Sequence, residues 1–272
     1  MPRIEVGQIG VVLNPGRGGA FADGVVALEE LGYSTIWIAG GPLEDLGQVV
    51  DVVRATRKVR VASGILSVDR FGPEAVASLY ADMEATHPGR FVVGLGGAHG
   101  PKPLHTLNTY LDRLDSVPPT ARVMAALGPR MLELARHRAA GALAVLVTPE
   151  YTAAARSRLG DDTTLAIEQL VVVDTDPERS RAIARGPVDF LGRVPAYRAN
   201  FHRMGFTDDE IARLDDRLVD AVVAWGDVDT LAQRVSEHLQ AGADHVAVSV
   251  TTGASGILPV DQWRQLATAL IP

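Results

Sequence analysis

Residues 123–132 read VMAALGPRML. A short apolar run, typical of a strand, breaks at Gly128, and Pro129 stands at the expected start of a helix that runs to about Ala139. Proline is tolerated in the first turn of a helix because the amide that it lacks would have no partner there. The apolar run Leu143–Val147 follows and predicts another strand. The stretch is therefore a strand–helix–strand unit.

The turn of this unit consists of Ala126, Leu127 and Gly128. Small residues before a helix let a ligand approach the backbone, and the free amides and positive dipole end of the helix favour an anion, typically a phosphate. An ordinary turn between a strand and a helix is the alternative interpretation. These residues alone leave both open.

The same unit recurs along the chain. A helix from Phe21 to Leu31 precedes the strand 35–39, and a helix capped by Asp227 and ended by Gly242 precedes the strand 245–250. Apolar residues three and four positions apart indicate helices, and glycine after the last turn supplies a left-handed cap. Strands that are nearly all apolar are typical of parallel sheets buried on both faces.

Eight strands are expected in all, at residues 4–13, 35–39, 59–66, 91–95, 122–126, 143–147, 165–173 and 245–250. Their alternation with helices, including those expected at 45–56 and 73–86, predicts a single α/β domain, a (β/α)₈ TIM-like barrel spanning residues 1–272. A doubly wound sheet is the alternative. Residues 192–222 are polar and helical and form an insertion before the last βα unit, as a lid over the barrel mouth or as a peripheral helical pair.

The composition narrows the function classes. The chain has 272 residues, of which 47% are hydrophobic and 22% charged, as in an ordinary soluble enzyme. Its net charge of −7 argues against nucleic acid or an anionic membrane as a partner. It contains no cysteine, and its 7 histidines show no metal-ligand spacing, so we expect no disulfide and no metal. Without a signal-peptide pattern or a run of spanning length, we expect a cytoplasmic protein.

In a barrel of this kind ligands bind at the carboxyl ends of the strands. The third expected strand contains Ser63-Gly64, which predicts a bulge or a close approach of backbone to a ligand, or else a simple bend. The sixth is followed by Thr148-Pro149, where Thr148 is expected to cap the next helix.

After the fourth expected strand comes the run Gly94-Leu95-Gly96-Gly97-Ala98-His99. It is no dinucleotide fingerprint, because His99 stands where the third glycine belongs. We interpret Gly96, Gly97 and Ala98 as a flat floor for a planar ring. His99 is either a proton donor or hydrogen-bond partner of that ring, or a histidine of a surface loop.

Together these segments resemble the luciferase-like monooxygenase superfamily, in particular its coenzyme F-420-dependent oxidoreductases and an uncharacterised actinobacterial group among them. The resemblance runs nearly end to end, over the segments Ala27–Trp37, Ser63–Ala77, Thr86–Gly96, Ala125–Leu134, Ala224–Asp227 and Ala241–Val246.

The resemblance implies a TIM-like barrel with a late insertion, a homodimer, and a non-proline cis peptide at Ser63–Gly64 that backs the central ring of the cofactor. It also places the cofactor phosphate at residues 126–128. Two departures matter. Gly40-Gly41 stands where the family's sugar-phosphate dehydrogenases have an Asp-His pair, and His99 replaces an acid. Sugar-phosphate oxidation is therefore disfavoured.

The expected function is hydride transfer between the deazaflavin coenzyme F-420 and a small organic substrate that the sequence does not identify. His99 is the candidate catalytic residue, and the candidate cofactor-binding residues are Ser63, Gly64, Gly96, Gly97, Ala98, Ala126, Leu127 and Gly128. The alternatives are an FMN-dependent monooxygenase of the same fold and a non-catalytic flavin-binding or scaffold relative.

Overall fold

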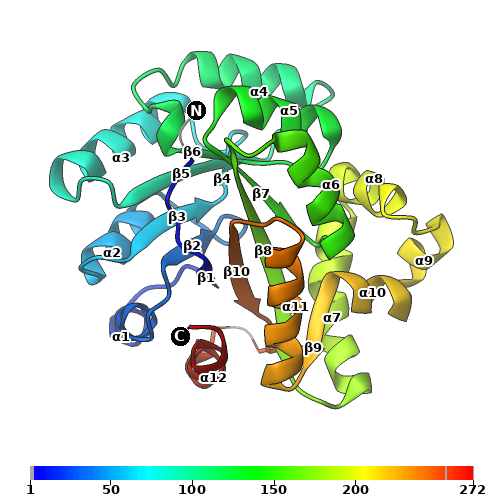
Figure 1. Ribbon diagram of the computed structural model, residues 1–272. Coiled ribbons are helices and arrows are strands. Elements are labelled where there is room, and N and C mark those ends of the chain that lie inside the picture. Colours follow the sequence, from blue (N-terminus) through cyan, green and yellow to red (C-terminus); the bar gives the residue numbers. More distant parts are fainter. Residues whose placement is uncertain (1–2, 255, 272) are drawn as a thin grey trace.

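The computed structural model describes residues 3–254 and 256–271, and its strands form a closed parallel barrel surrounded by helices (Figure 1). The eight strands of the barrel are β1 (Ile9–Leu13), β2 (Thr35–Ala39), β3 (Arg60–Gly64), β5 (Phe91–Gly96), β6 (Arg122–Ala125), β7 (Gly141–Val145), β8 (Thr164–Val173) and β10 (His245–Val250). Each pairs in parallel with the next, and β10 closes the ring by pairing with both β8 and β1. The predicted (β/α)₈ barrel is confirmed, and the doubly wound alternative is wrong.

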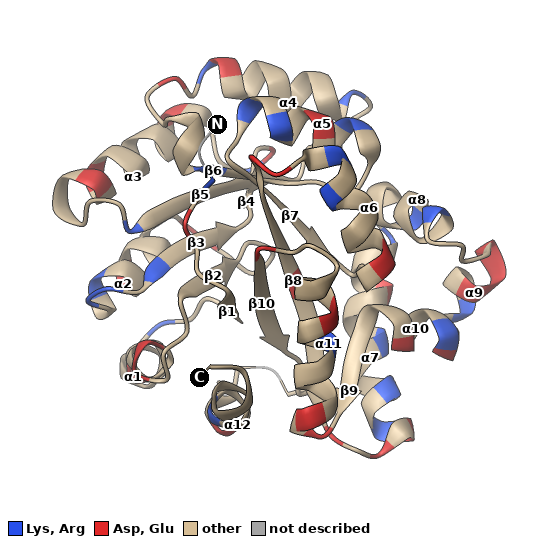
Figure 2. Cartoon of the chain, in the orientation of Figure 1, with Lys and Arg blue, Asp and Glu red and all other residues tan. Residues whose placement is uncertain are grey.

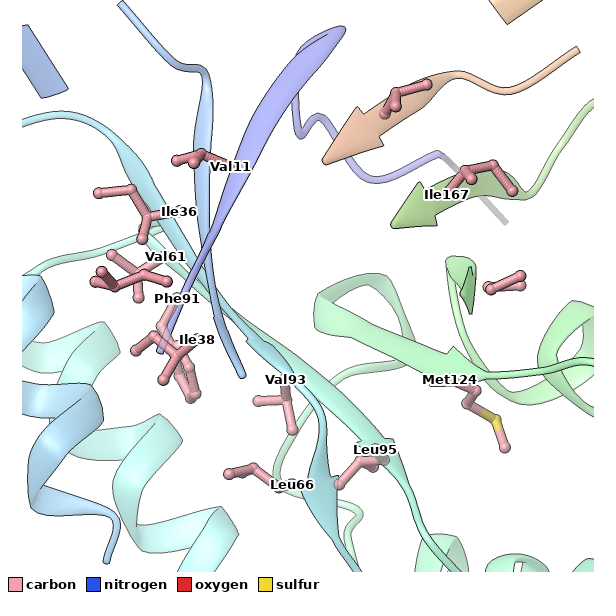
Figure 3. Close-up of a cluster of buried hydrophobic side chains, with 14 of the residues drawn as sticks. Val11, Ile36, Ile38, Val61, Leu66, Phe91, Val93, Leu95, Met124 and Ile167 are labelled. Atoms are coloured by element: carbon pink, nitrogen blue, oxygen red, sulfur yellow. The ribbon is translucent and has the colours of Figure 1, made fainter. Parts of the chain in front are cut away.

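Alternate residues along the strands separate two apolar layers. Val12, Trp37 and Ala62 belong to a cluster inside the barrel. Their neighbours Val11, Ile36 and others belong to the larger cluster between the strands and the helices, part of which Figure 3 shows. This separation follows from the two-residue period of a strand, and it means that residues of one parity line the interior.

The helices outside the barrel are α1 (Gly19–Glu30), α2 (Gly47–Ala55), α3 (Pro73–Thr86), α4 (Pro103–Asp112), α5 (Pro129–Arg138), α6 (Pro149–Leu159), α7 (Pro177–Gly192), α11 (Val228–Gln240) and α12 (Val260–Leu270), with a short 3₁₀ turn at Pro119–Ala121. Charged residues lie mainly on these helices and on loops, while the strands carry few (Figure 2). The expected caps are confirmed: Thr148 accepts a hydrogen bond from the Tyr151 amide, and Asp227 accepts one from the Thr230 amide.

The insertion holds three helices, α8 (Pro195–Arg203), α9 (Asp208–Arg213) and α10 (Asp216–Val222). They are grouped beside α6 and α7 (Figure 1) and share a separate apolar cluster with α7 and the carboxyl half of β8. Phe201, Leu218 and Val188 are fully buried in it. The helical insertion is confirmed, and most of it packs beside the barrel as the peripheral alternative requires.

Some boundaries differ from the sequence prediction. The first strand begins at Ile9 instead of residue 4, and the sixth covers Gly141–Val145 because Leu146 takes a left-handed conformation with φ 55°. The third is divided by a cis peptide into β3 and β4 (Leu66–Ser67), and that cis bond joins Gly64 to Ile65, not Ser63 to Gly64. The expected position was therefore wrong by one residue.

One strand was missed altogether. β9 (Val223–Gly226) directly follows the insertion and pairs with the carboxyl half of β8, outside the closed ring. Four residues are too few to show a period in sequence, and the pairing depends on the extra length of β8.

Two features are absent from the described residues: a membrane-spanning helix and a metal-binding cluster. No helix among them is long and apolar enough to cross a membrane. Residues 3–254 and 256–271 also contain no cluster of three His, Asp or Glu side chains that could hold a metal ion.

Candidate active site

The mouth of the barrel contains a bulge at Ser63-Gly64-Ile65, where β3 passes into β4. The Ser63 side chain is fully buried; its hydroxyl accepts a hydrogen bond from the Gly94 amide at 2.9 Å and lies 3.0 Å from the Gly94 carbonyl, to which it donates. The predicted cofactor residue Ser63 therefore fastens the bulge to β5 with its side chain. Only its backbone remains for a ligand.

Neighbouring strands make room for the bulge with glycines. A Cβ at Gly40 would lie 1.7 Å from the Ile65 carbonyl oxygen, and a Cβ at Gly94 would lie 1.8 Å from that of Ser63. No side chain fits at either position. Gly40 is therefore required by the shape of the barrel, independently of any acid–base pair that other proteins carry there.

The predicted ring floor lies beside the bulge. Gly96 is buried, and a Cβ on it would come within 2.8 Å of Ala125 Cβ and 3.2 Å of the Ile65 side chain. Gly97 has φ 77°, and a Cβ there would approach Ser67 Oγ to 2.7 Å. Ala98 packs against the outer apolar layer. The floor is therefore continuous with the bulge.

His99 extends from the end of this floor toward the rim. Its backbone amide and its ring Nδ1 both bond the same oxygen of Asp69, at 2.9 and 3.0 Å. Because a carboxylate only accepts, Nδ1 carries the hydrogen and Nε2 is left as an acceptor in the neutral ring. The His99 side chain is 57% exposed. Asp69, which the sequence interpretation did not include, holds the His99 ring in one orientation.

The turn at residues 126–128 is held by Tyr151 of α6. The tyrosine hydroxyl lies 3.1 Å from the Ala126 carbonyl and 2.9 Å from the Leu127 carbonyl. Since the carbonyl and the N–H of one trans peptide point in opposite directions, the amides of Leu127 and Gly128 point away from Tyr151. The Ala126 amide, in contrast, donates a hydrogen bond to the Leu143 carbonyl.

The Leu127 and Gly128 amides donate to no carbonyl in the part of the chain that the structure describes. Gly128 is the N-cap of α5, with Pro129 as its first residue, as the sequence predicted. The guanidinium of Arg203, from α8, is 3.6 Å from the place that a Cβ of residue 128 would occupy. Two amides without a carbonyl partner, a helix N-terminus and a nearby arginine thus occur together at Gly128, and these features suit a phosphate.

Glu168 of β8 is the titratable residue of the interior that sequence reasoning missed. It has the parity of Ala166, which belongs to the inner cluster, and it lies in the middle of β8, level with Val145 at the end of β7 and with Ala247 of β10. Surrounding protein desolvates the carboxylate and raises the pKa of Glu168 to about 7, while the Ser249 hydroxyl of β10 lowers it by less. In the sequence, one acidic residue within an apolar run was the available signal.

Tyr197 of α8 packs against the apolar cluster of the insertion. Burial raises the pKa of Tyr197, and the charges of Glu168 and Tyr151 raise it further.

Two other buried histidines are structural. Trp37 Nε1 donates to His245 Nε2 at 2.8 Å inside the barrel, and His245 Nδ1 donates to the Gly7 carbonyl at 2.7 Å. His238 lies 2.8 Å from both Thr152 and Gln169. Burial lowers the pKa of each histidine to about 4. Both are neutral near pH 7 and saturated with partners.

Hollows also occur away from the mouth. One of about 410 Å³ lies between α1 and α2, and another of about 510 Å³ lies beside β9 and the start of α11. Neither is lined by the bulge, the floor or Glu168. We place the candidate site at the strand ends, where parallel barrels bind their ligands.

No protein-family model matches the chain, and no curated protein sequence does. Solved structures do. A coenzyme F-420-dependent tetrahydromethanopterin reductase from Methanopyrus kandleri aligns with a TM-score of 0.73 at 19% identity, covering 98% of this chain and 99% of the reductase. An F-420-dependent secondary alcohol dehydrogenase, solved with an F-420–acetone adduct, aligns with a TM-score of 0.74 at 14% identity over 98% and 99% of the two chains.

The FMN-bound oxygenating constituent of 3,6-diketocamphane monooxygenase, a type II Baeyer–Villiger monooxygenase from Pseudomonas putida, aligns with a TM-score of 0.67 at 12% identity, over 96% of each chain. These are the two kinds of protein that the sequence resemblance names. The chain therefore shares the TIM-barrel fold of these proteins, and identities this low establish the fold alone.

Proposed function

We propose that the protein is an oxidoreductase that binds the deazaflavin coenzyme F-420 in the barrel mouth and transfers a hydride between it and a small organic substrate. The proposal is carried by the Leu127 and Gly128 amides, which have no carbonyl partner among the described residues, and by Arg203, which lies near Gly128. This turn follows β6 and the bulge follows β3, so the proposed phosphate site and the bulge lie at the ends of separate strands of one barrel. The two F-420-dependent enzymes described above align with TM-scores of 0.73 and 0.74, and the FMN-bound monooxygenase aligns with 0.67.

In this proposal the residues bind and orient, and the coenzyme, when bound, supplies hydride chemistry. The turn at residues 126–128 holds the phosphate, the bulge at Gly64–Ile65 and the floor from Gly96 to Ala98 support the ring, and His99 exchanges a proton at the rim. Asp69 keeps the histidine ring in one orientation.

An FMN-dependent monooxygenase is the second candidate, favoured by the likeness to the FMN-bound structure. Titration of the purified protein with oxidised F-420, reduced F-420 and FMN separates the candidates. We expect F-420 to bind at least tenfold more tightly than FMN, a difference of about 1.4 kcal/mol. Tight binding of FMN alone would select the monooxygenase. Failure to bind either cofactor would overturn both and support the non-catalytic scaffold.

We also propose a homodimer, as the resemblance implies. The Phe190 side chain on the outer face of α7 is 69% exposed, which is unusual for an aromatic residue and suits burial against a second copy. Light scattering in solution tests the dimer. A monomer at micromolar concentration would exclude it.

A further inference from the structure

The position of Glu168 in the ring of strands suggests a role beyond cofactor binding. Around the barrel, β3 is the third strand and β8 the seventh of eight. The two strands therefore lie on opposite sides of the barrel, and Glu168, whose parity is that of the inner cluster, is directed to the interior from the side opposite the bulge.

We propose that Glu168 exchanges a proton with the substrate across the barrel from the ring, and that the substrate carries a neutral hydroxyl or carbonyl group at the reacting carbon. This inference rests on the proposed function. In the direction of oxidation, the carbon gives a hydride to F-420, and the O–H bond breaks. Its electron pair forms the second carbon–oxygen bond, and the proton passes to the Glu168 carboxylate. The reverse reaction returns the proton from Glu168 to the carbonyl oxygen.

The surroundings of Glu168 suit this role. In the register of β8 and β10, Glu168 lies opposite Ala247, and Ser249 follows on the same face two residues later. The Ser249 hydroxyl influences the pKa of Glu168, and Glu168 and Tyr151 influence the pKa of Tyr197. The serine and tyrosine hydroxyls are uncharged near pH 7 and provide partners for a neutral oxygen. A carboxyl group with a pKa of about 7 is half protonated at neutral pH, so it can both donate and accept.

His99 is less suited to this proton. Its side chain is 57% exposed on the loop after β5, which lies on the bulge side of the mouth. It is positioned to exchange protons between the ring side and water. Glu168 is half-buried on an inward-facing position of β8, so its proton exchange is directed to the interior of the barrel.

The first test needs no substrate. Infrared spectra of protein with ¹³C-labelled glutamate are recorded against pH for the parent, for Glu168→Gln, and for Glu178→Gln as an exposed control on α7. We expect the band of a neutral carboxyl group to titrate near pH 7 in the parent and in the control, and to be missing in Glu168→Gln. A parent spectrum without such a band would overturn the inference.

The second test measures coenzyme binding and turnover of a panel of short secondary alcohols and ketones. We expect Glu168→Gln to bind F-420 within twofold of the parent and to lose at least a hundredfold in kcat, because a positioned acid–base group contributes about 10²–10⁴-fold. In a plot of kcat against pH, the change near pH 7 that the parent shows should be missing in Glu168→Gln.

The outcomes separate the two proposals. A parent protein that fails to bind F-420 overturns the proposed function and the role built on it. Binding with undiminished kcat in Glu168→Gln overturns the role of Glu168 alone. A parent that binds F-420 but turns over none of the panel overturns the hydroxyl–carbonyl class.

Discussion

The structure explains Gly40 differently from the sequence comparison. Compared with proteins that carry an Asp-His pair at these positions, Gly40-Gly41 indicates the loss of two catalytic residues. The structure shows that the bulge requires Gly40, because any Cβ there overlaps the Ile65 carbonyl oxygen at 1.7 Å. Gly41 has open space around its Cβ position. The residues that we propose to exchange protons, His99 and Glu168, lie elsewhere in the barrel.

Gly40→Ala should destabilise the protein by about 3 kcal/mol or more, because a rigid backbone carbonyl has to move to accept the methyl group. Gly41→Ala, one residue on, should change the free energy of unfolding by less than about 0.5 kcal/mol. Urea unfolding of both variants measures this difference. Equal stability of the two would show that the bulge can shift at little cost.

At the scale of elements, the proposed phosphate site draws on three parts of the chain. α5 provides the helix terminus, α6 provides Tyr151, which orients the turn, and α8 of the insertion provides Arg203. The insertion thus adds a positive charge. Without it, the barrel would offer a phosphate only backbone amides.

Gly128→Val should weaken F-420 binding at least tenfold, about 1.4 kcal/mol, because its branched side chain occupies the approach between the turn and Arg203. Leu127→Ala should bind within twofold of the parent, since the contact is made by the main chain. Fluorescence titration measures both. If Gly128→Val binds as tightly as the parent, the phosphate lies elsewhere.

Arg203→Gln should weaken F-420 binding about tenfold and reduce its dependence on salt, because one charge-assisted contact to phosphate is lost. Arg198→Gln is the matched control on the same helix, where Arg198 pairs with Asp208. Titration at two ionic strengths should leave the control within twofold of the parent. Equal losses in both variants would assign the effect to net charge instead of to contact.

At the scale of the whole molecule, buried titratable groups make stability depend on pH. The pKa values of His238 and His245 are lowered from 6.5 to about 4, so the native state binds fewer protons than the unfolded state between these values. The free energy of unfolding therefore falls as pH falls through 6.5 toward 4. Glu168 acts in the opposite sense: its pKa is raised from 4.5 to about 7, so its contribution falls as pH rises through that window.

NMR spectra of the native protein test this through the histidine ring protons. Those of His238 and His245 should stay at neutral-ring positions down to about pH 5. Each buried histidine should add at most about 3 kcal/mol to the loss of stability on acidification. A midpoint near 6.5 for His238 or His245 would contradict their enclosed positions.

The sequence by itself determined the barrel and the turn at residues 126–128. Helix periods, glycine stops and apolar strands are local patterns, and they located the eight barrel strands, the caps at Thr148 and Asp227, and the helix that begins at Pro129. These features depend on neighbours within a few residues, which a sequence displays directly.

Only the tertiary structure decided the composition of the mouth. Glu168 is directed to the interior from the side opposite the bulge, Tyr151 orients the turn and Arg203 reaches Gly128 because closure of the ring and packing of the insertion bring together residues up to a hundred or so positions apart. The place of the cis bond, at Gly64–Ile65, was likewise set by contacts with β2 and β5. Such partners leave no period or spacing in the chain, since side-chain encounters across a barrel depend on register and closure, which local patterns do not encode.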